Sequence, residues 1–546
     1  MGSLTIYELP AELIIHILNA LDYKTLLHTR QVCRLFNKLY QNAAGLQYKV
    51  ELAVANMENG PPSGLGAADR LQRLKQHQEA WATLTPNAQQ IVPMLKGSVW
   101  ELYGGVLSQA RGSSTLAFKQ LPSVVRGIED KEWTVSGLGF DIRDYGMDPS
   151  QQLLAIIQKP ARSSVNNEMI QIHLRSLFTG ASHPAARDPA VLTHTPEGIR
   201  HSFTIQISSV FLGILFESRD QLYNELVIWN WQTGAIEMWM SGTEIASFQF
   251  LSDRHVLVGY VMPLLNVNQL GAPPREPRLV VVDFLVAAPE KVEAKRADFV
   301  CSFHFPILAQ WAIPLAVSIR SDPAPSWTPH RDLQVPFYTS RDERLFVVTF
   351  WAADGGNIRT ILLFTLTSSL FAHIETLQPG EKKRRFAWGD WGPMGSRMMM
   401  APTGHSDTWV CYVHGTKFVS PRRWGMQKGI QVYDFNVLPY KRRLAELNTD
   451  SDAEVEKYSW ISDPSALGDL VLIFQGPVST GLPYRVQVMY PPADDNGNDY
   501  EAVMLSEDTL ITLASVSSAI ACEIAHTSDD ATWPAYSRTV NVHTAL

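Results

Sequence analysis

Apolar residues recur at helical spacing in three short runs near the start of the chain. Pro10 suits the first position of the first helix, because it needs no hydrogen-bond partner there and its φ is preset. Glu12 follows where a negative charge favours the helix dipole, and Asp22 is a candidate N-cap for the second helix. The pattern predicts three short amphipathic helices. Their apolar positions are Leu9, Leu13, Ile14, Ile17, Leu18 and Leu21, then Leu26 and Leu27, then Val32, Cys33, Phe36 and Leu39.

These runs carry more apolar surface than three helices of this length can bury among themselves. Burying one large aliphatic side chain contributes about 1.5–3 kcal/mol, so leaving several of them in water is unfavourable. Two interpretations are open. The helices pack on each other and on the domain behind them, or they present an apolar face to a partner.

The order and spacing of these residues resemble an F-box over about residues 4–48. Phe36 stands where that family often has Trp, so an aromatic ring is retained. The residues that carry the resemblance are Leu9-Pro10, Glu12-Leu13, Ile17-Leu18, Leu21, Leu26-Leu27, Arg30, Val32-Cys33-Arg34, Phe36 and Leu39.

The resemblance implies a helical module, residues 1–50, that binds a Skp-family adaptor and through it a cullin-based SCF ubiquitin ligase. The chain would then be a substrate receptor, which performs no chemistry and raises the effective concentration of a substrate near the ubiquitin carrier. Some of the implied contact residues belong to the core of the bundle, and the sequence does not divide the two sets. The adaptor contacts that the resemblance implies are Leu9, Pro10, Leu13, Ile14, Ile17, Leu18, Leu26, Leu27, Val32, Cys33 and Phe36.

Residues 51–98 are expected to form a helical linker with a Pro/Gly loop. The cluster of turn-forming residues at 59–66 predicts the loop. Residues 67–84 have helical character, with Leu71 and Leu74 apolar and Trp81 further on. Such a helix is either a stiff spacer or an element packed onto the next domain.

From about residue 99 to 546 the apolar pattern changes to period two, which is typical of β-strands. Residues 203–239 read as four strands with a tight turn at Thr233-Gly234 before the last one. Four antiparallel strands per repeat predict the blades of a β-propeller, and this stretch resembles a WD-repeat blade, although the Gly-His signature of that family is missing.

The expected fold is therefore multidomain, an α-helical F-box followed by an all-β, WD-like propeller that binds the substrate. Seven blades are expected, with six or eight as alternatives. The first blade, at about 99–136, is the least complete. Strands near Val503 and Leu510 are expected to close the ring, which would remove exposed sheet edges.

Composition limits the kinds of fold, partner and cellular location that are expected for the protein. With 45% hydrophobic and 18% charged residues, a large core is expected. A net charge of −8 argues against bulk binding to nucleic acid or anionic membrane. The four cysteines Cys33, Cys301, Cys411 and Cys522 suggest neither a disulfide framework nor a zinc site. With no secretory signal or bilayer-spanning stretch recognised, a cytoplasmic or nuclear location is expected.

No motif selects a catalytic residue, a metal site or a cofactor. Gly404-His405-Ser406-Asp407-Thr408 begins like a hydrolase nucleophile elbow, but Thr408 stands where the elbow needs Gly. Basic residues are the candidates for binding an acidic or phosphorylated degron, because Arg pairs bidentately with phosphate. Solvated loop charge and a nuclear address are the alternative interpretations. These candidates are Lys382, Lys383, Arg384, Arg385, Arg422 and Arg423.

Two other functions are open at this stage. One is a scaffold that uses the helices and the propeller without ubiquitin transfer. The other is a propeller hydrolase, which would be favoured by carboxylates or a Ser-His pair clustered at the channel mouth. The protein substrate is not identified by the sequence.

Overall fold

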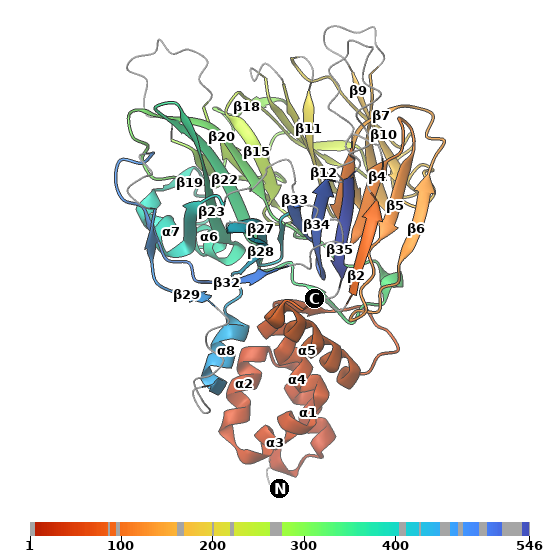
Figure 1. The fold of residues 1–546 in the computed structure, drawn as a ribbon, viewed down its shortest axis with the longest axis vertical. Coiled ribbons are helices and arrows are strands. Elements are labelled where there is room, and N and C mark those ends of the chain that lie inside the picture. Colours follow the sequence, from red (N-terminus) through yellow and green to blue (C-terminus); the bar gives the residue numbers. More distant parts are fainter. Residues whose placement is uncertain are drawn as a thin grey trace.

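The computed structural model describes most of the chain. The described residues are 6–85, 88–93, 95, 99–160, 169–198, 201–218, 223–262, 276–402, 411–424, 427–447, 459–467, 473–490, 500–515 and 538–544. They form a helical domain and a β-propeller, with the helices of the N-terminal part of the chain below one end of the propeller (Figure 1).

The three predicted N-terminal helices are confirmed, and two further helices follow them. Asp22 caps the second helix as predicted, since its carboxylate accepts from the backbone N–H groups of Lys24 and Thr25. Cys33 caps the third helix through its sulfur, 3.5 Å from Phe36 N. The elements are η1 (Ile6–Glu8), α1 (Ala11–Ala20), α2 (Tyr23–Val32), α3 (Arg34–Asn42), α4 (Ala44–Ala55), β1 (Met57–Asn59) and α5 (Ala67–Thr83).

Helix α4 joins the helical domain to the propeller because it is apolar on two faces. Leu46 and Val50 pack into the core formed by α1, α2 and α3. Tyr48 and Leu52 pack instead into a second core with α5 and with Phe337 of the propeller. A helix with apolar residues on both faces is buried between two bodies, so α4 is shared by both.

The propeller prediction is confirmed. Within the described residues, six sheets each take four antiparallel strands from one stretch of chain. The first three are β3–β6 (Trp100–Tyr103, Val106–Ala110, Leu116–Gln120, Lys131–Val135), β7–β10 (Ile142–Asp148, Leu153–Gln158, Ile170–Ser176, Val191–His194) and β11–β14 (Ser202–Ser208, Phe211–Glu217, Glu225–Asn230, Ala235–Ser241). The next three are β15, β16, β17 and β19 (Ile245–Phe250, His255–Tyr260, Arg278–Asp283, Cys301–His304), β20, β22, β23 and β25 (Ala312–Arg320, Leu345–Asp354, Asn357–Leu366, Ser396–Met400), and β26, β27, β28 and β32 (Val413–His414, Lys417–Trp424, Gln427–Asp434, Tyr484–Met489).

A closing sheet joins the two ends of the propeller segment. Its order is β2 (Ala88–Pro93), β35 (Arg538–Thr544), β34 (Thr509–Ser515) and β33 (Tyr500–Leu505). The strands expected to close the ring are therefore present. Strand β2 lies inside the segment expected as a linker, and sequence reasoning missed it.

The stretch at 203–239 folds into the four predicted strands, β11 to β14, with Gly234 at φ +74° in the turn before β14. Trp229 and Trp231 are buried in the core between this sheet and the sheet of β7–β10. Three helices in the β-rich part were not predicted: α6 (Thr367–Ile374), α7 (Trp388–Gly395) and α8 (Leu438–Leu447). The remaining short elements are β18 (Val292–Glu293), η2 (Arg331–Leu333), β21 (Phe337–Thr339), β24 (Arg384–Phe386), β29 (Ser459–Ile461), β30 (Ser465–Ala466) and β31 (Ser479–Thr480).

Candidate interaction face and the junction with the propeller

The structure divides the eleven candidate adaptor contacts into three groups by burial. Ile14, Leu18, Leu26 and Phe36 are buried in the core of the helical domain. Leu9, Leu27 and Cys33 are half-buried. The exposed group is Pro10, Leu13, Ile17 and Val32.

The exposed group carries large apolar side chains in water. Leu13 is 51% exposed and Ile17 42%, and they lie one turn apart on α1. Val32 is 69% exposed at the end of α2. Ile6 and Leu35 are also exposed, and sequence reasoning had not selected them. Such exposure on a small helical domain is typical of a binding surface. We call Ile6, Pro10, Leu13, Ile17, Val32 and Leu35 the apolar face.

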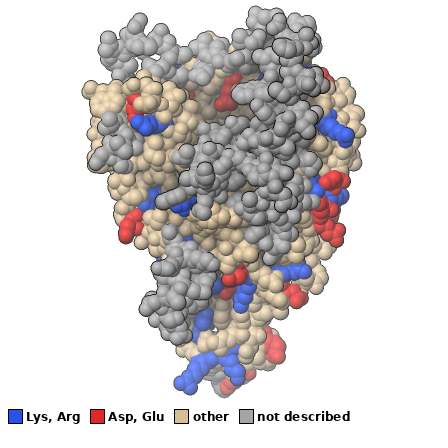
Figure 2. Space-filling view, in the orientation of Figure 1, with Lys and Arg blue, Asp and Glu red and all other residues tan. Residues whose placement is uncertain are grey.

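Basic side chains are exposed on the two helices that carry Val32 and Leu35. Lys24 of α2 and Arg34 and Lys38 of α3 are exposed. Figure 2 shows Lys and Arg side chains at the free end of the helical domain, farthest from the propeller. A partner that covers the apolar face would therefore gain from acidic groups at its rim, since complementary charge steers association.

The junction between the two domains is held by backbone pairing and by Arg70. Strand β1 pairs antiparallel with β21. The carbonyl of Pro336 accepts hydrogen bonds from Tyr48 Oη at 2.6 Å, Arg70 Nη1 at 2.9 Å and Gly60 N at 2.9 Å. Arg70 is buried and also donates to Asn59 Oδ1 at 2.9 Å. The predicted Pro/Gly loop is thus pinned between α5 and the propeller.

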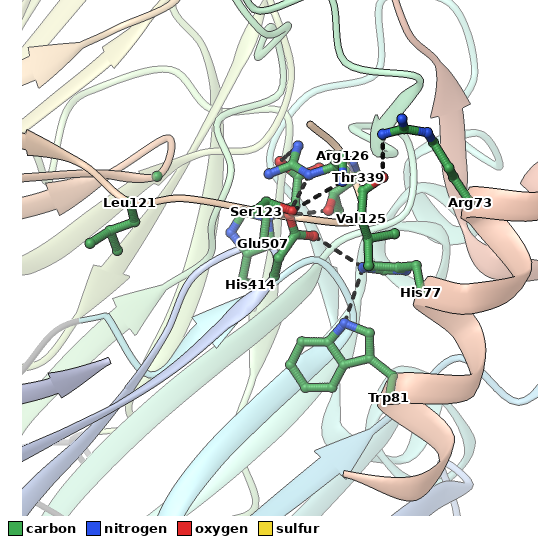
Figure 3. Close-up of polar contacts among 12 residues, drawn as sticks. Arg73, His77, Trp81, Leu121, Ser123, Val125, Arg126, Thr339, His414 and Glu507 are labelled. Atoms are coloured by element: carbon green, nitrogen blue, oxygen red, sulfur yellow. Dashed lines mark hydrogen bonds and ion pairs between the residues drawn. The ribbon is translucent and has the colours of Figure 1, made fainter. Parts of the chain in front are cut away.

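A buried network of charged and polar side chains joins α5 to the propeller (Figure 3). Arg126, from the connection between β5 and β6, pairs with Asp508 and lies 2.6 Å from Glu507 Oε2. His77 Nε2 of α5 lies 3.1 Å from both Asp508 Oδ1 and Trp81 Nε1. When Nε2 of His77 carries no proton, it accepts a hydrogen bond from the indole N–H of Trp81. When Nε2 is protonated, it donates to the carboxylate of Asp508.

The same network reaches β21 and β26. Glu507 accepts from the backbone N–H of Thr339, and Thr339 Oγ1 lies 3.2 Å from His414 Nε2. Burial, followed by the charges of Arg126 and Lys417, lowers the pKa of His414 to about 3, so this ring is neutral. Because these groups come from distant parts of the chain, the network ties the helical domain to the closed ring. The linker helix is therefore packed on the propeller.

Gly60→Ala is expected to loosen this junction. A Cβ at residue 60 would lie 1.8 Å from the carbonyl oxygen of Val335, so the backbone must shift and the bond to Pro336 is lost. We expect a destabilisation of about 1–3 kcal/mol in thermal or denaturant unfolding. Gly64→Ala, in the same loop with open space around it, is the matched control and should leave stability unchanged. Equal effects of the two variants would contradict this description of the junction.

The first four basic candidates are paired with acidic side chains. Two lysines share Asp298, whose pKa their hydrogen bonds and charges lower. Surface pairs of this kind reduce the positive potential offered to a degron. The pairs are Lys382–Asp298 at 3.0 Å, Lys383–Asp298 at 3.1 Å, Arg384–Glu381 at 3.6 Å and Arg385–Glu276 at 2.6 Å. Arg422 and Arg423 lie apart from them on β27, and the side chain of Arg423 is outside the described part of the chain. The structure thus does not gather all six residues into one site.

Apolar side chains are also exposed at the end of the propeller far from the helices. Ile358 is 66% exposed and Ile313 36%, and both are register partners of Ala353, so they share one sheet face. Trp311 is 55% exposed beside them in sequence. The opposite end of β22 adjoins the helices, since Asn56 donates to the carbonyl of Glu343.

The described residues contain no cluster of three or more His, Cys, Asp or Glu side chains arranged to hold a metal ion. None of the described helices is long and apolar enough to cross a membrane. The segment Gly404-His405-Ser406-Asp407-Thr408 lies outside the described residues.

Comparison with known proteins identifies the helical domain. The chain combines a small helical domain with a β-propeller. Residues 6–44 match the F-box-like family, so the chain has an F-box-like domain followed by a propeller. No protein with a curated description matches the chain.

Solved structures resemble the chain only distantly. Extracellular domains 1–2 of Drosophila Semaphorin 1b share 7% identity over 84% of this chain and 87% of that chain, with a TM-score of 0.36. The WD40 domain of SCAP from fission yeast shares 9% identity over 72% of this chain and 84% of that chain, with a TM-score of 0.27. The Malassezia sympodialis allergen Mala s 1 shares 10% identity over 63% and 90%, with a TM-score of 0.28. At these values the likeness carries no inference about function.

Proposed function

We propose that this protein is the substrate-recognition subunit of an SCF-type ubiquitin ligase, acting in the cytoplasm or nucleus. Its F-box-like domain binds a Skp-family adaptor, and its propeller binds the protein substrate. The chain itself performs no catalytic step and needs no cofactor. Its contribution is to hold the substrate near the charged ubiquitin carrier, which raises the effective concentration of a substrate lysine.

The main observation in support of this proposal is that the apolar face lies in the segment that matches the F-box-like family. Leu13, Ile17 and Val32 belong to the residues 6–44 that match the F-box-like family, and all three remain exposed while Ile14, Leu18, Leu26 and Phe36 form the core. A domain that folds by itself has no stability reason to keep these three side chains in water. We assign Pro10, Leu13, Ile17 and Val32 to the adaptor and the buried residues to the bundle.

The junction supports a receptor role because it fixes the orientation of the propeller relative to the helical domain. A flexible linker would let the propeller sample many orientations relative to the adaptor. Here α4 is shared by two cores, and α5 is tied to the ring through His77, which contacts Asp508 of the Arg126–Glu507–Asp508 network. A substrate on the propeller would therefore be held at one distance and orientation from the ligase.

Capture of a cullin distinguishes the receptor from the scaffold. The tagged full-length protein, mixed with purified adaptor and cullin, is expected to retain both in one complex. The Leu13→Asp/Ile17→Asp variant should retain neither, while remaining folded by circular dichroism. Retention of the adaptor without the cullin would favour the scaffold, and retention of neither by the wild-type protein would overturn the proposal.

The hydrolase alternative has one observation in its favour. Glu101, Asp144 and Asp322 line a cavity in the central channel, where such an enzyme would place its carboxylates. The cavity holds only about 180 Å³, below the roughly 300–1,000 Å³ of sites for drug-sized ligands. A protein or polysaccharide chain does not fit such a volume, so we interpret it as a site for a small ligand.

A further inference from the structure

A cavity lies in the central channel of the propeller, away from the apolar face. The strands that line it are the first strands of five sheets, β3, β7, β11, β15 and β20. Each of these strands contacts the next one around the ring. The cavity is therefore formed by the ring as a whole, and no single sheet contains it.

Three carboxylates from three sheets face this cavity. Glu101 lies in β3, Asp144 lies in β7, and Asp322 follows β20. Arg320 is the one guanidinium among the described lining residues, and it donates to the carbonyl of Ile319 at 3.2 Å. No described carboxylate forms an ion pair with it. The cavity thus holds three carboxyl groups and one guanidinium. The charge of Arg320 lowers the pKa values of Glu101 and Asp322, but it does not outweigh the effect of burial.

Burial makes this arrangement unfavourable for the empty protein. It raises the pKa of Glu101 to about 8, with the charges of Asp322 and Asp144 adding to the effect. Burial also raises the pKa values of Asp144 and Asp322 to about 6. A cation placed among them would remove the repulsion and favour the ionised forms. Clustered perturbed carboxylates in a cavity are typical of functional sites.

An unpartnered buried hydroxyl lines the same cavity. Ser321 is 1% exposed, and its Oγ has no hydrogen-bond partner among the described residues. Buried polar atoms normally have a partner, so this oxygen indicates a missing hydrogen-bonding group. Ser321 thus adds a hydroxyl without a described partner to the cavity that Glu101, Asp144 and Asp322 also line.

The chain that follows Ser321 packs against the end of β3. Ala324 N donates to Tyr103 Oη at 3.0 Å. Trp327 covers Gly104, where a Cβ would lie 2.3 Å from the indole and φ is +57°, so glycine is required. These contacts fix the position of the segment that carries Ser321 and Asp322 relative to β3.

We propose that this cavity binds a small organic cation, with an ammonium or guanidinium group held by Glu101, Asp144 and Asp322. Ser321 Oγ accepts a hydrogen bond from the same group, and Arg320 is left to meet an anionic or polar end of the ligand. The volume favours a compact amine or guanidine over a larger molecule. This proposal is independent of adaptor binding.

Thermal unfolding of the full-length protein with matched probes tests the proposal. The cations n-butylamine and agmatine at millimolar concentration are expected to raise the unfolding midpoint by at least about 2 °C. The neutral isostere n-butanol should leave it unchanged. Equal responses to n-butylamine and n-butanol in the wild-type protein would overturn the proposal without any variant.

Variants of the carboxylates test the assignment of the site. Glu101→Gln/Asp322→Asn is expected to remove the response to both cations, and Ser321→Ala to weaken it. Asp141→Asn, an exposed acid of the same sheet region that does not line the cavity, should keep the full response. An unchanged response in the double variant would place the binding elsewhere and overturn the assignment.

The double variant is expected to fold, because it removes buried like charges. The raised pKa of Glu101 means that the folded protein prefers the protonated form, so ionising this group destabilises the fold as the pH rises from about 4.5 toward 8. Without ligand at pH 8, Glu101→Gln should therefore have a higher unfolding midpoint than the wild-type protein. If the ionised Glu101 instead stabilised the fold, Glu101→Gln would lower the unfolding midpoint at pH 8.

Discussion

Replacing Leu13 and Ile17 with aspartate is expected to lower the affinity for a Skp-family adaptor at least about 100-fold. Each side chain, when buried by a partner, contributes about 1.5–3 kcal/mol, and about 1.4 kcal/mol corresponds to a factor of ten. Because Leu13 and Ile17 are 51% and 42% exposed in the free protein, the substitution leaves the bundle core intact. Calorimetric titration with purified adaptor measures the change.

Two controls define this prediction. Val124→Asp changes a side chain that is 69% exposed on the propeller, outside the helical domain, and should leave adaptor affinity unchanged. Ile14→Ala alters the buried core and should instead lower the unfolding midpoint. If the Leu13/Ile17 variant bound as tightly as the wild-type protein, the apolar face would not be the adaptor contact.

Arg126→Met is expected to destabilise the junction by about 3–5 kcal/mol, because it leaves a buried ion network without its cation. Arg126 is 6% exposed and pairs with Glu507 and Asp508, both of which are buried. The side chain of Met replaces the volume but not the charge, so two carboxylates would repel each other out of contact with water. Denaturant unfolding, followed by the fluorescence of buried tryptophans such as Trp81, measures the loss.

Lys119→Met is the matched control for this prediction. Lys119 also pairs with two carboxylates, Asp130 at 2.9 Å and Glu132 at 2.7 Å, but the side chain of Glu132 is 70% exposed. Water can solvate these partners when the lysine is removed, so the expected loss is at most about 1 kcal/mol. Similar losses in the two variants would mean that the Arg126 network does not hold the junction.

Local patterns predicted the parts of the fold that local interactions specify. The three N-terminal helices follow from apolar spacing and from the capping by Asp22, both of which act within a few residues. The strands β11 to β14 follow from period-two runs and the turn at Gly234. In each case the signal and the structure lie in the same short segment.

Interactions between distant segments were not predictable from these patterns. Strand β2 pairs with β35, which comes from the other end of the propeller segment. The six residues of β2 contain no pattern that would indicate this pairing. The network of Arg126, Glu507 and Asp508 was missed for the same reason. The carboxylates of Glu101, Asp144 and Asp322 gather only because β3, β7 and β20 are inner strands of one ring.

The candidate interaction face was predicted in part. The sequence selected Leu13, Ile17 and Val32 together with core residues such as Ile14 and Leu26, because both groups share the same apolar spacing. Only the packing of α4 against α1, α2 and α3 shows which side chains it covers. Leu35 was missed although it lies three residues after Val32 and four before Leu39, and it is exposed.

Direct binding of the purified full-length protein to a purified Skp-family adaptor tests the central proposal. We expect a one-to-one complex with a dissociation constant of about 1 µM or tighter, as expected for an apolar face of several large side chains. Isothermal titration calorimetry and size-exclusion chromatography would both detect it. No complex with adaptor at about 100 µM, from protein that is folded and monodisperse, would contradict the proposed function.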